Sequence, residues 1–370
     1  SLLGTPSITL TAADSTVNVS GGTYGSNTGY TDYLQSTFDI VKTAGDKTLT
    51  LNADRSIKLV QRTIDGTTTS GKLDVALNPF ESSAHGNNGG AVILQGSDSV
   101  TASIKSNGGT IDLGSSGTAA TGFGADLSGI KDGIYLENAV LDSRIAGDAS
   151  QTGANITLNG SAPTTTTAGA GVRIKGALTN LRSGTGDLTL TGSVPGQKDG
   201  VVIGEDGSSR VTLATTTGAI AITGDATGVG ATPAVTGASR YDGVVISSAA
   251  LIQSGSGNIT TVGKGSGGDQ SYLVENHGIK LENAKTSIVS TSGAISLYGS
   301  SGGKTSDTGG ANSFGIYSAG DTMYIGSAPI SAVSGGVIAS GNIVLAADSM
   351  QLINSSNLHL NVASSGELRI

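Results

Sequence analysis

The segment Gly133-Ile134-Tyr135-Leu136-Glu137-Asn138-Ala139-Val140-Leu141, followed by Asn155-Ile156-Thr157-Leu158, contains the unit from which most of the chain is built. It reads as three short strands: one after an opening glycine, one directly behind it, and one after a turn. In the first and third strands, apolar residues occupy every second position, which is the period of a strand with one buried face. A stretch rich in Gly, Ser and Thr then leads to the next unit.

This unit recurs at intervals from 29 residues (Gly171 to Gly200) to 43 residues (Gly90 to Gly133). The variation falls mainly in the stretch after the third strand, where added length raises the entropy of loop closure only slowly. Helical and propeller repeats would need steadier periods and longer elements. The opening glycines are Gly90, Gly133, Gly171, Gly200, Gly243, Gly278 and Gly315, and the third strands start at Ile111, Ile156, Leu188, Ile220, Ile259, Ile295 and Ile343.

None of the three strands can bury its apolar face alone, so the repeated units are expected to stack on one another. Stacking at about 4.8 Å places like strands in parallel register around a narrow core of Ile, Leu and Val. Glycines are expected where the chain turns sharply with positive φ. The sequence therefore predicts an all-β fold, a right-handed parallel β-helix (solenoid) with variable-length loops. About eleven coils would give a rod on the order of 50 Å long.

Residues 1–89 are predicted to form less regular N-terminal coils, and residues 90–370 regular repeats of one continuous solenoid. Within the first part, Lys47–Asp54 and Lys72–Asn78 keep the period of two and are predicted strands of the same stack. The stretch Gly21–Thr37, which carries Tyr24, Tyr30 and Tyr33, is predicted to be an excursion packed on the outside.

The composition excludes several classes of protein. The 370 residues include 59 Gly, only 6 Pro and no Cys, with 13% charged residues and a net charge of −8. Few Lys and Arg argue against nucleic-acid binding, and glycine without a period of three argues against collagen. Absence of Cys suits a chain that crosses an outer membrane unfolded. No signal peptide precedes Ser1, and Glu367–Ile370 read as mid-strand, so we expect a piece of a longer protein.

Three carboxylates directly precede opening glycines: Asp132, Asp199 and Asp242. Asp199 and Asp242 belong to neighbouring units, so stacking would bring them together as a calcium site or as a catalytic pair like that of β-helical pectin-degrading enzymes. The alternative is an Asp-Gly turn, in which Asp bonds its own backbone and Gly takes positive φ. Other units place Ala170, His277 and Phe314 there, as turn chemistry allows, and the structural interpretation is preferred.

Other polar residues give weaker signals. Asn138 and Asn283 occupy one slot and are predicted to satisfy backbone groups inside a bend. The three histidines, His85, His277 and His359, are far apart in the sequence, and Gly265–Asp269 resembles a calcium-binding repeat only once. No catalytic residue, metal site or cofactor is predicted, and the binding residues stay unknown. Asn-x-Ser/Thr sequons, which also arise by chance in such a chain, start at Asn18, Asn155, Asn159, Asn258 and Asn354.

The segments Thr48–Ile57, Gly71–Asn78 and Gly89–Leu94 resemble the exoproteins of bacterial two-partner secretion, the filamentous-haemagglutinin-like and high-molecular-weight-type adhesins. Gly255–Thr260 is similar to their central repeats. The resemblance implies a right-handed β-helical fibre, export through an outer-membrane transporter of the two-partner type, and attachment or biofilm formation. The family's secretion domain carries Asn-Pro-Asn motifs, which are absent here, so a central region is expected.

The expected function is that of a structural and adhesive segment of a large bacterial exoprotein, secreted and exposed at the cell surface, and not of an enzyme. Its ligand would be a host-cell or matrix component, a glycan among the candidates, contacted by the variable loops or by exposed strand faces. Two alternatives stay open. A β-helical polysaccharide lyase or hydrolase would need clustered Asp, Arg and Lys on adjacent coils, and a surface-layer or sheath protein would assemble laterally.

Overall fold

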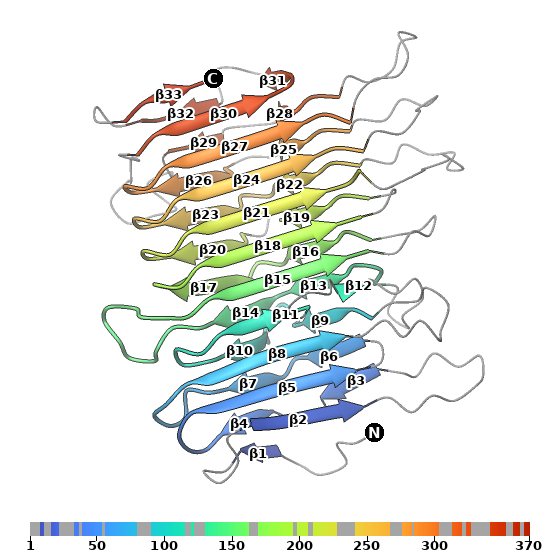
Figure 1. Ribbon diagram of the computed structural model, residues 1–370, viewed down its shortest axis with the longest axis vertical. Coiled ribbons are helices and arrows are strands. Elements are labelled where there is room, and N and C mark those ends of the chain that lie inside the picture. The colour runs from blue at the N-terminus through green and yellow to red at the C-terminus, as the bar shows by residue number, and fades with distance from the viewer. Residues whose placement is uncertain are drawn as a thin grey trace, which may run out of the picture.

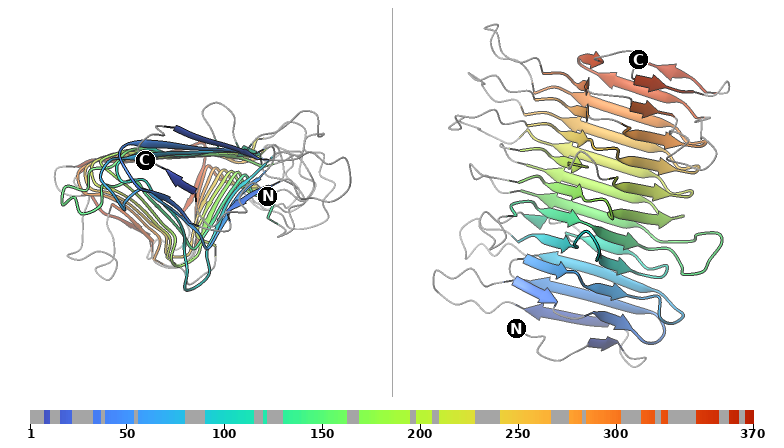
Figure 2. Two further views of the ribbon diagram at one scale, coloured as in Figure 1. Left: turned by 90° about the horizontal axis from the view of Figure 1, so that it is seen from below. Right: turned by 180° about the vertical axis from the view of Figure 1, so that it is seen from behind.

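Three short strands per coil form a right-handed parallel β-helix, in which each coil lies directly on the one before it (Figure 1). Viewed along the axis, the three sheets form the sides of a triangle (Figure 2). The computed structural model describes residues 8–10, 16–21, 33–36, 39–53, 56–79, 90–114, 120–121, 130–162, 169–194, 198–205, 210–227, 241–266, 276–282, 285–302, 313–319, 323–326, 341–352, 358–362 and 366–370.

Each sheet takes one strand from every coil, and the chain passes through sheet C, then sheet A, then sheet B. Sheet A stacks β1 (Ile8–Leu10), β4 (Ile40–Lys42), β7 (Thr63–Asp65), β10 (Ala102–Lys105), β14 (Ala139–Asp142), β17 (Asn180–Gly184), β20 (Thr212–Thr215), β23 (Leu251–Ser254), β26 (Ser287–Ser290), β29 (Met323–Ile325) and β32 (Leu358–Leu360). Sheet B stacks β2 (Thr16–Gly21), β5 (Lys47–Ala53), β8 (Leu73–Pro79), β11 (Ile111–Leu113), β15 (Ile156–Ser161), β18 (Leu188–Ser193), β21 (Ile220–Asp225), β24 (Ile259–Lys264), β27 (Ile295–Ser300), β30 (Ile343–Ala347) and β33 (Leu368–Arg369), with β12 (Ala120–Thr121) beside β15. Sheet C stacks β3 (Tyr33–Ser36), β6 (Ser56–Val60), β9 (Val92–Gln95), β13 (Ile134–Glu137), β16 (Val172–Lys175), β19 (Val201–Ile203), β22 (Val244–Ile246), β25 (Ile279–Glu282), β28 (Ile316–Ala319) and β31 (Met350–Leu352).

The core is a continuous column of aliphatic side chains held in register from coil to coil. Leu190 of β18, for example, lies beside Leu158 on one side and Ile222 on the other. The cluster extends from Ile40 to Leu345, and its members are at most 3% exposed. Each Val, Leu or Ile side chain of this column contributes about 1.5–3 kcal/mol by leaving water. The predicted fold class is confirmed, and with it the strands predicted from the alternating pattern.

Sheets B and C differ in how much of their outer faces is covered. Strands of sheet B alternate buried and half-buried residues, as along β15 and β18. In β19 and β22 of sheet C every residue is buried. Their sequences, Val-Val-Ile in both strands, are continuous apolar runs, which are typical of strands buried on both faces. Val202 and Val245 pack with Ala170 in a small cluster outside the main core.

The corner between sheets B and C is closed by two facing columns of glycine. A Cβ atom on Gly224 would lie 1.9 Å from the carbonyl oxygen of Gly243, and one on Gly192 would lie 2.0 Å from that of Gly200. The prediction that the opening glycines take positive φ is wrong, because none of the seven opening glycines is among the positive-φ residues. Glycine is required at this corner because two backbone segments touch. The facing pairs are Gly160–Gly171, Gly192–Gly200, Gly224–Gly243, Gly263–Gly278 and Gly299–Gly315.

The corner between sheets A and B is closed from the inside by hydroxyl groups. Thr215 Oγ1 donates a hydrogen bond to the carbonyl of Gly218 at 2.6 Å, and Ser183 Oγ donates to that of Gly186 at 2.7 Å. The glycines of this corner also stack, since a Cβ on Gly218 would lie 1.8 Å from the carbonyl oxygen of Gly186. A Ser/Thr-x-x-Gly sequence therefore marks this turn.

Connections of unequal length occur mainly between sheet B and sheet C, as predicted. Residues 194–200 join β18 to β19, whereas residues 226–243 join β21 to β22. An excursion also leaves the corner between sheets A and B: residues 143–155 join β14 to β15, and Arg144 forms an antiparallel bridge with Gly153. The sequence pattern did not indicate this excursion.

The N-terminal coils belong to the same three sheets. The predicted strands Lys47–Asp54 and Lys72–Asn78 correspond to β5 and β8. The predicted excursion Gly21–Thr37 is wrong in part, because Tyr33 lies in β3, which pairs with β6. Tyr24 and Tyr30 lie outside the described residues. Among the residues that the structure describes, there is no helix long and apolar enough to cross a membrane.

Candidate functional site at the start of sheet C

One residue from each of six successive coils directly precedes a strand of sheet C and its opening glycine. The strands are in register, with Val172, Val201 and Val244 side by side, so these residues form a single column along the corner. We call this set the corner column. Its members are Asp132, Ala170, Asp199, Asp242, His277 and Phe314.

The polar side chains of the corner column accept hydrogen bonds from the backbone of the next coil. Asp199 Oδ1 accepts from the amide of Asp242 at 2.9 Å, and Asp242 Oδ1 accepts from the amide of His277 at 2.7 Å. His277 Nδ1 accepts from the amide of Phe314 at 3.0 Å. Asp132 Oδ1 accepts likewise from Ala170 at 2.6 Å. The preferred structural interpretation is thus supported, but its geometry was wrong: Asp bonds the neighbouring coil and not its own turn.

Asp132 is held by an arginine from the next coil. Arg173 of β16 places Nε 2.9 Å from Asp132 Oδ1 and a terminal nitrogen 2.6 Å from Glu205 Oε1. Burial alone would lower the pKa of Arg173, but Asp132 and Glu205 outweigh it and hold that pKa above its ordinary value. Burial raises the pKa of Asp132, and the nearby Arg173 opposes this effect. The three side chains form a brace across neighbouring coils.

A second brace lies on the outer face of sheet C. Glu137 Oε2 accepts hydrogen bonds from Gln95 and from the Tyr135 hydroxyl, both at 2.8 Å, and Oε1 lies 3.2 Å from Lys175 Nζ. Burial acts to raise the pKa of Glu137, but these three partners outweigh it and lower that pKa. Burial and the Glu137 carboxylate raise the pKa of Tyr135. Since each group has a partner, the network is suited to holding coils together.

Aromatic rings stack at the C-terminal end of the corner column. The His277 ring is nearly parallel to that of Tyr317, with centroids 4.1 Å apart, and Phe314 lies 5.9 Å from His277. Lys280 is only 2% exposed, and its Nζ lies 3.1 Å from Glu282 Oε2. The same Nζ lies 5.9 Å from the centre of the Tyr317 ring, within range of a cation–π contact.

The pair Asp199 and Asp242 is brought together, as the sequence predicted. Asp242 is fully buried and Asp199 is half-buried. Among the described residues, neither has an ion pair, and Asp242 Oδ2 is buried without a hydrogen-bond partner. Burial, reinforced by the carboxylate of Asp199, raises the pKa of Asp242 well above its ordinary value. Burial also raises the pKa of Asp199. Asp132 is separated from this pair by the coil that carries Ala170.

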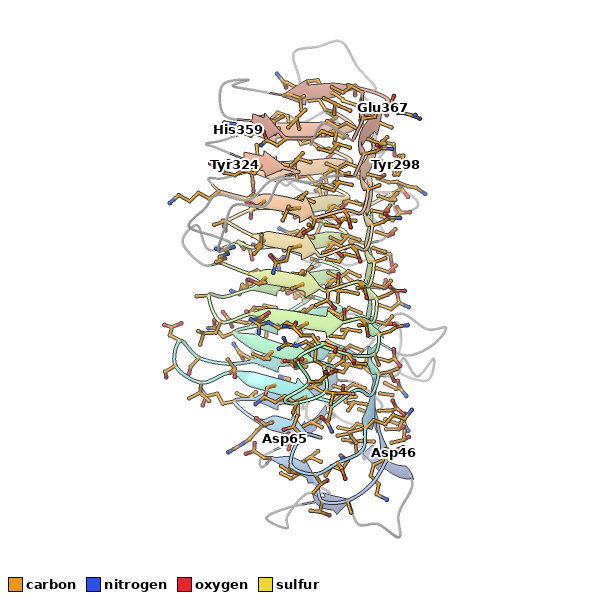
Figure 3. All side chains as sticks on the ribbon, turned by 90° about the vertical axis from the view of Figure 1, so that its left-hand side faces the viewer. Asp46, Asp65, Tyr298, Tyr324, His359 and Glu367 are labelled. Carbon is orange, nitrogen blue, oxygen red and sulfur yellow. The ribbon has the colours of Figure 1, made fainter. Side chains whose placement is uncertain are left out.

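The other residues predicted from the sequence are dispersed. Asn138 has a φ of +47°, and its Oδ1 accepts from the amide of Leu178 in the next coil at 3.1 Å, which supports the predicted structural role. His359 stacks on Tyr324 on sheet A (Figure 3), whereas His277 belongs to the corner column. Within the described ranges, no three or more His, Cys, Asp or Glu residues form a group that could hold a metal. His85, Asp269 and Asn283 lie outside them.

A second column of side chains, at the start of sheet B, was not predicted. Asn155 Oδ1 accepts from the amide of Asp187 at 2.9 Å, and Asp187 Oδ1 accepts from that of Ala219 at 2.8 Å. Asp74, Asn258 and Asn342 act in the same way. The sequence signal is Asp or Asn directly before the first apolar residue of the third strand. Asp74 differs only in that an apolar residue, Leu73, also precedes it. The sequon residues Asn155 and Asn258 belong to this column.

The comparisons with known proteins give no match: no protein family, no curated protein and no solved structure is similar to this chain at a significant level. Its function therefore has to be inferred from its own residues.

Proposed function

We propose that this chain is a structural and adhesive segment of a large secreted bacterial exoprotein, exposed at the cell surface and acting in attachment or biofilm formation. The observation that carries the proposal is one uninterrupted stack of coils whose connections of unequal length leave mainly from one corner. A rigid scaffold that presents variable connections is a common way to build a binding surface.

The scaffold is suited to a stalk because every coil is held by its neighbours. The aliphatic core continues from Ile40 to Leu345, and side chains of two columns bond the amides of the next coil. The chain contains no Cys, so burial and hydrogen bonding account for its stability without disulfides. The same lack of Cys favours export through an outer-membrane transporter of the two-partner type, which is the proposed partner for secretion.

The connections between sheets B and C are the proposed contact region for a host-cell or matrix ligand. The short connection 194–200 and the long connection 226–243 begin and end at equivalent places, because Gly192 pairs with Gly224 and Val201 pairs with Val244. In both coils, paired glycines close the corner between sheets B and C in the same way. The connection can therefore change in length while the coils stay in register.

An exchange of connections tests this proposal. Residues 226–243 are replaced by the sequence of residues 194–200, and binding to cultured epithelial cells and to immobilised matrix proteins is measured. We expect an unchanged circular-dichroism spectrum and a several-fold loss of binding. The matched control replaces the excursion 143–155 by the equivalent short connection 183–187, since Asp142 pairs with Arg182 and Ile156 with Leu188, and this variant should keep binding. If the chain with every connection intact binds neither cells nor matrix, the adhesive role is rejected.

A β-helical polysaccharide-degrading enzyme is the second candidate, favoured by the carboxyl pair of Asp199 and Asp242 near Arg173 and Lys280. A carboxyl group with a raised pKa is suited to act as a general acid. Against this, Asp242 is fully buried and one oxygen of each carboxyl is taken by a backbone amide. A screen with acidic and neutral glycans decides: activity that disappears in Asp199→Asn and Asp242→Asn variants would replace the adhesive role.

A further inference from the structure

Asp199 and Asp242 are two carboxyl groups stacked in neighbouring coils. The amide of Asp242 donates to Asp199 Oδ1, so the second aspartate lies directly on the first. Asp242 Oδ1 in turn accepts from His277, while its Oδ2 has no partner among the described residues. The negative charge of Asp199 acts on the fully buried Asp242, and two such charges in neighbouring coils repel each other in a medium of low dielectric constant.

The charged groups around the pair are engaged elsewhere. Arg173 of β16 lies between Asp132 and Glu205, at 2.9 Å and 2.6 Å. Lys280 of β25 lies 3.1 Å from Glu282, whose negative charge also acts on Asp242. Lys198 is near enough to favour ionisation of Asp199 but forms no ion pair with it. β19 and β22 themselves contribute only valine and isoleucine. Within the part of the chain that the structure describes, neither carboxyl forms an ion pair, and the charges of Arg173 and Lys280 act on the pair only from a distance.

Either a cation or a proton can remove the repulsion. Calcium usually takes six to eight oxygen ligands, and the described residues gather no metal-binding group. Asp242 Oδ2 is also closed off from solvent, which leaves little room for a hydrated ion. A proton needs no coordination shell, and it turns the buried oxygen from an unpartnered acceptor into a hydroxyl group.

We propose that Asp199 and Asp242 bind one proton between them at neutral pH and form a pH-sensitive joint between the coils that begin with Gly200 and Gly243. In the unfolded chain both carboxyl groups ionise near their ordinary pKa of about 3.9. Folding above that pH therefore takes up a proton. Because the folded pKa is raised, the stabilisation is complete below about pH 4 and is lost as the pH rises through the folded pKa.

The test is chemical unfolding from about pH 4 to about pH 9, followed for the natural chain and for an Asp242→Asn variant. We expect the folding equilibrium constant of the natural chain to fall by up to about tenfold for each unit that the pH rises, over the pH range in which unfolding releases one proton. The variant should lose this component and be the more stable protein at alkaline pH. Its amide oxygen can still accept from His277, and it carries no charge that repels Asp199.

The matched control is Asp187→Asn, in the column at the start of sheet B. Asp187 also caps the next coil, through Ala219, but it is exposed, and Asn already occupies this column at Asn155. This variant should keep the pH dependence of the natural chain. An Asp242→Asn variant with the same pH dependence as the natural chain would overturn the proposal.

Two further measurements keep the proposal testable if the Asp242→Asn variant does not fold. The infrared spectrum of the natural chain at neutral pH should contain a protonated-carboxyl band that disappears at alkaline pH, and its absence would overturn the proposal. Unfolding at alkaline pH is also measured in the presence of calcium chloride and in the presence of a chelator, and the two free energies of unfolding are compared. Stabilisation by calcium would make the pair a metal site and would likewise reject the bound proton.

Discussion

Lys42 illustrates how a single residue departs from the repeat at a structural junction. It is fully buried, and its ammonium group donates to the carbonyl oxygens of Ser70 and Gly71 at 2.9 Å and of Gly45 at 3.1 Å. Burial lowers the pKa of Lys42, and the nearby Asp46 carboxylate opposes this effect. Thr69 contributes two further acceptors at 3.3 Å. The side chain ties the end of β4 to the connection between β7 and β8.

Replacing Lys42 by Met should therefore destabilise the first coils. The variant keeps most of the apolar stem but removes the charged donor to the carbonyl groups of Gly45 and Ser70, while the carbonyl of Gly71 keeps a hydrogen bond from Asn107. We expect a loss of about 1.5–3 kcal/mol in the free energy of unfolding, the range for hydrogen bonds to charged groups. Lys72→Met is the control, since that side chain is 52% exposed and its ion pair with Asp74 is worth about 0–1 kcal/mol. Equal losses in urea unfolding would contradict the role given to Lys42.

The sequence predicts that Lys42 is buried, but not which carbonyl groups accept its hydrogen bonds. Ile40-Val41-Lys42 alternates, and the pattern places Lys42 on the same side as Ile40, where the structure also buries it. The carbonyl groups that receive it come from residues 45 and 69–71, which no local pattern connects with residue 42. The same holds for Asp199 and Asp242: their stacking followed from the repeat, but the absence of an ion pair among the described residues depended on where Arg173 and Lys280 found partners.

At the scale of the strand and its turn, glycine columns determine where the chain can bend. Two long strands of sheet B have the same pattern, with glycine at the last position but one. They are β18, which contains Leu188-Thr189-Leu190-Thr191-Gly192, and β21, which contains Ile220-Ala221-Ile222-Thr223-Gly224. The repeat predicts that these glycines matter. It does not distinguish a glycine needed for positive φ from one needed for the close approach of two backbone segments, because the residue is glycine in both cases.

Two alanine substitutions separate these two kinds of glycine. Gly224→Ala places a Cβ atom 1.9 Å from the carbonyl oxygen of Gly243, so the corner has to open and we expect a loss of about 1–3 kcal/mol. Gly147→Ala meets no atom within 4 Å but has a φ of +79°, and its strain should cost only about 1 kcal/mol. Thermal unfolding of both variants provides the comparison. A larger loss for Gly147→Ala would show that backbone strain, and not contact, dominates.

For the whole molecule, the alternating pattern predicted the three-sheet solenoid because every coil repeats the same burial problem. It did not predict that β19 and β22 are covered on both faces, since alternation identifies the inner face of a strand but not which outer faces are covered. It also missed the excursion 143–155. This excursion occurs in one coil only, so the repeated pattern contains no signal for it.

Stability should be distributed along the rod as a sum over coils and their contacts with neighbours. Leu190 in β18 is fully buried between Leu158 and Ile222, so Leu190→Ala should cost about 2–5 kcal/mol. Leu360 in β32 is half-buried and pairs with Ile325 in β29, so Leu360→Ala should cost clearly less.

Hydrogen exchange of the amides in β18 and β32 distinguishes a local effect from a global one. If neighbouring coils are the unit of stability, Leu360→Ala should speed exchange in β32 and β29 and leave β18 protected. Leu190→Ala should speed exchange in β15, β18 and β21 first, because those strands share its contacts. Uniform acceleration over all strands in both variants would instead mean that the rod unfolds as one cooperative body, and a stalk of that kind would not tolerate local opening at any coil.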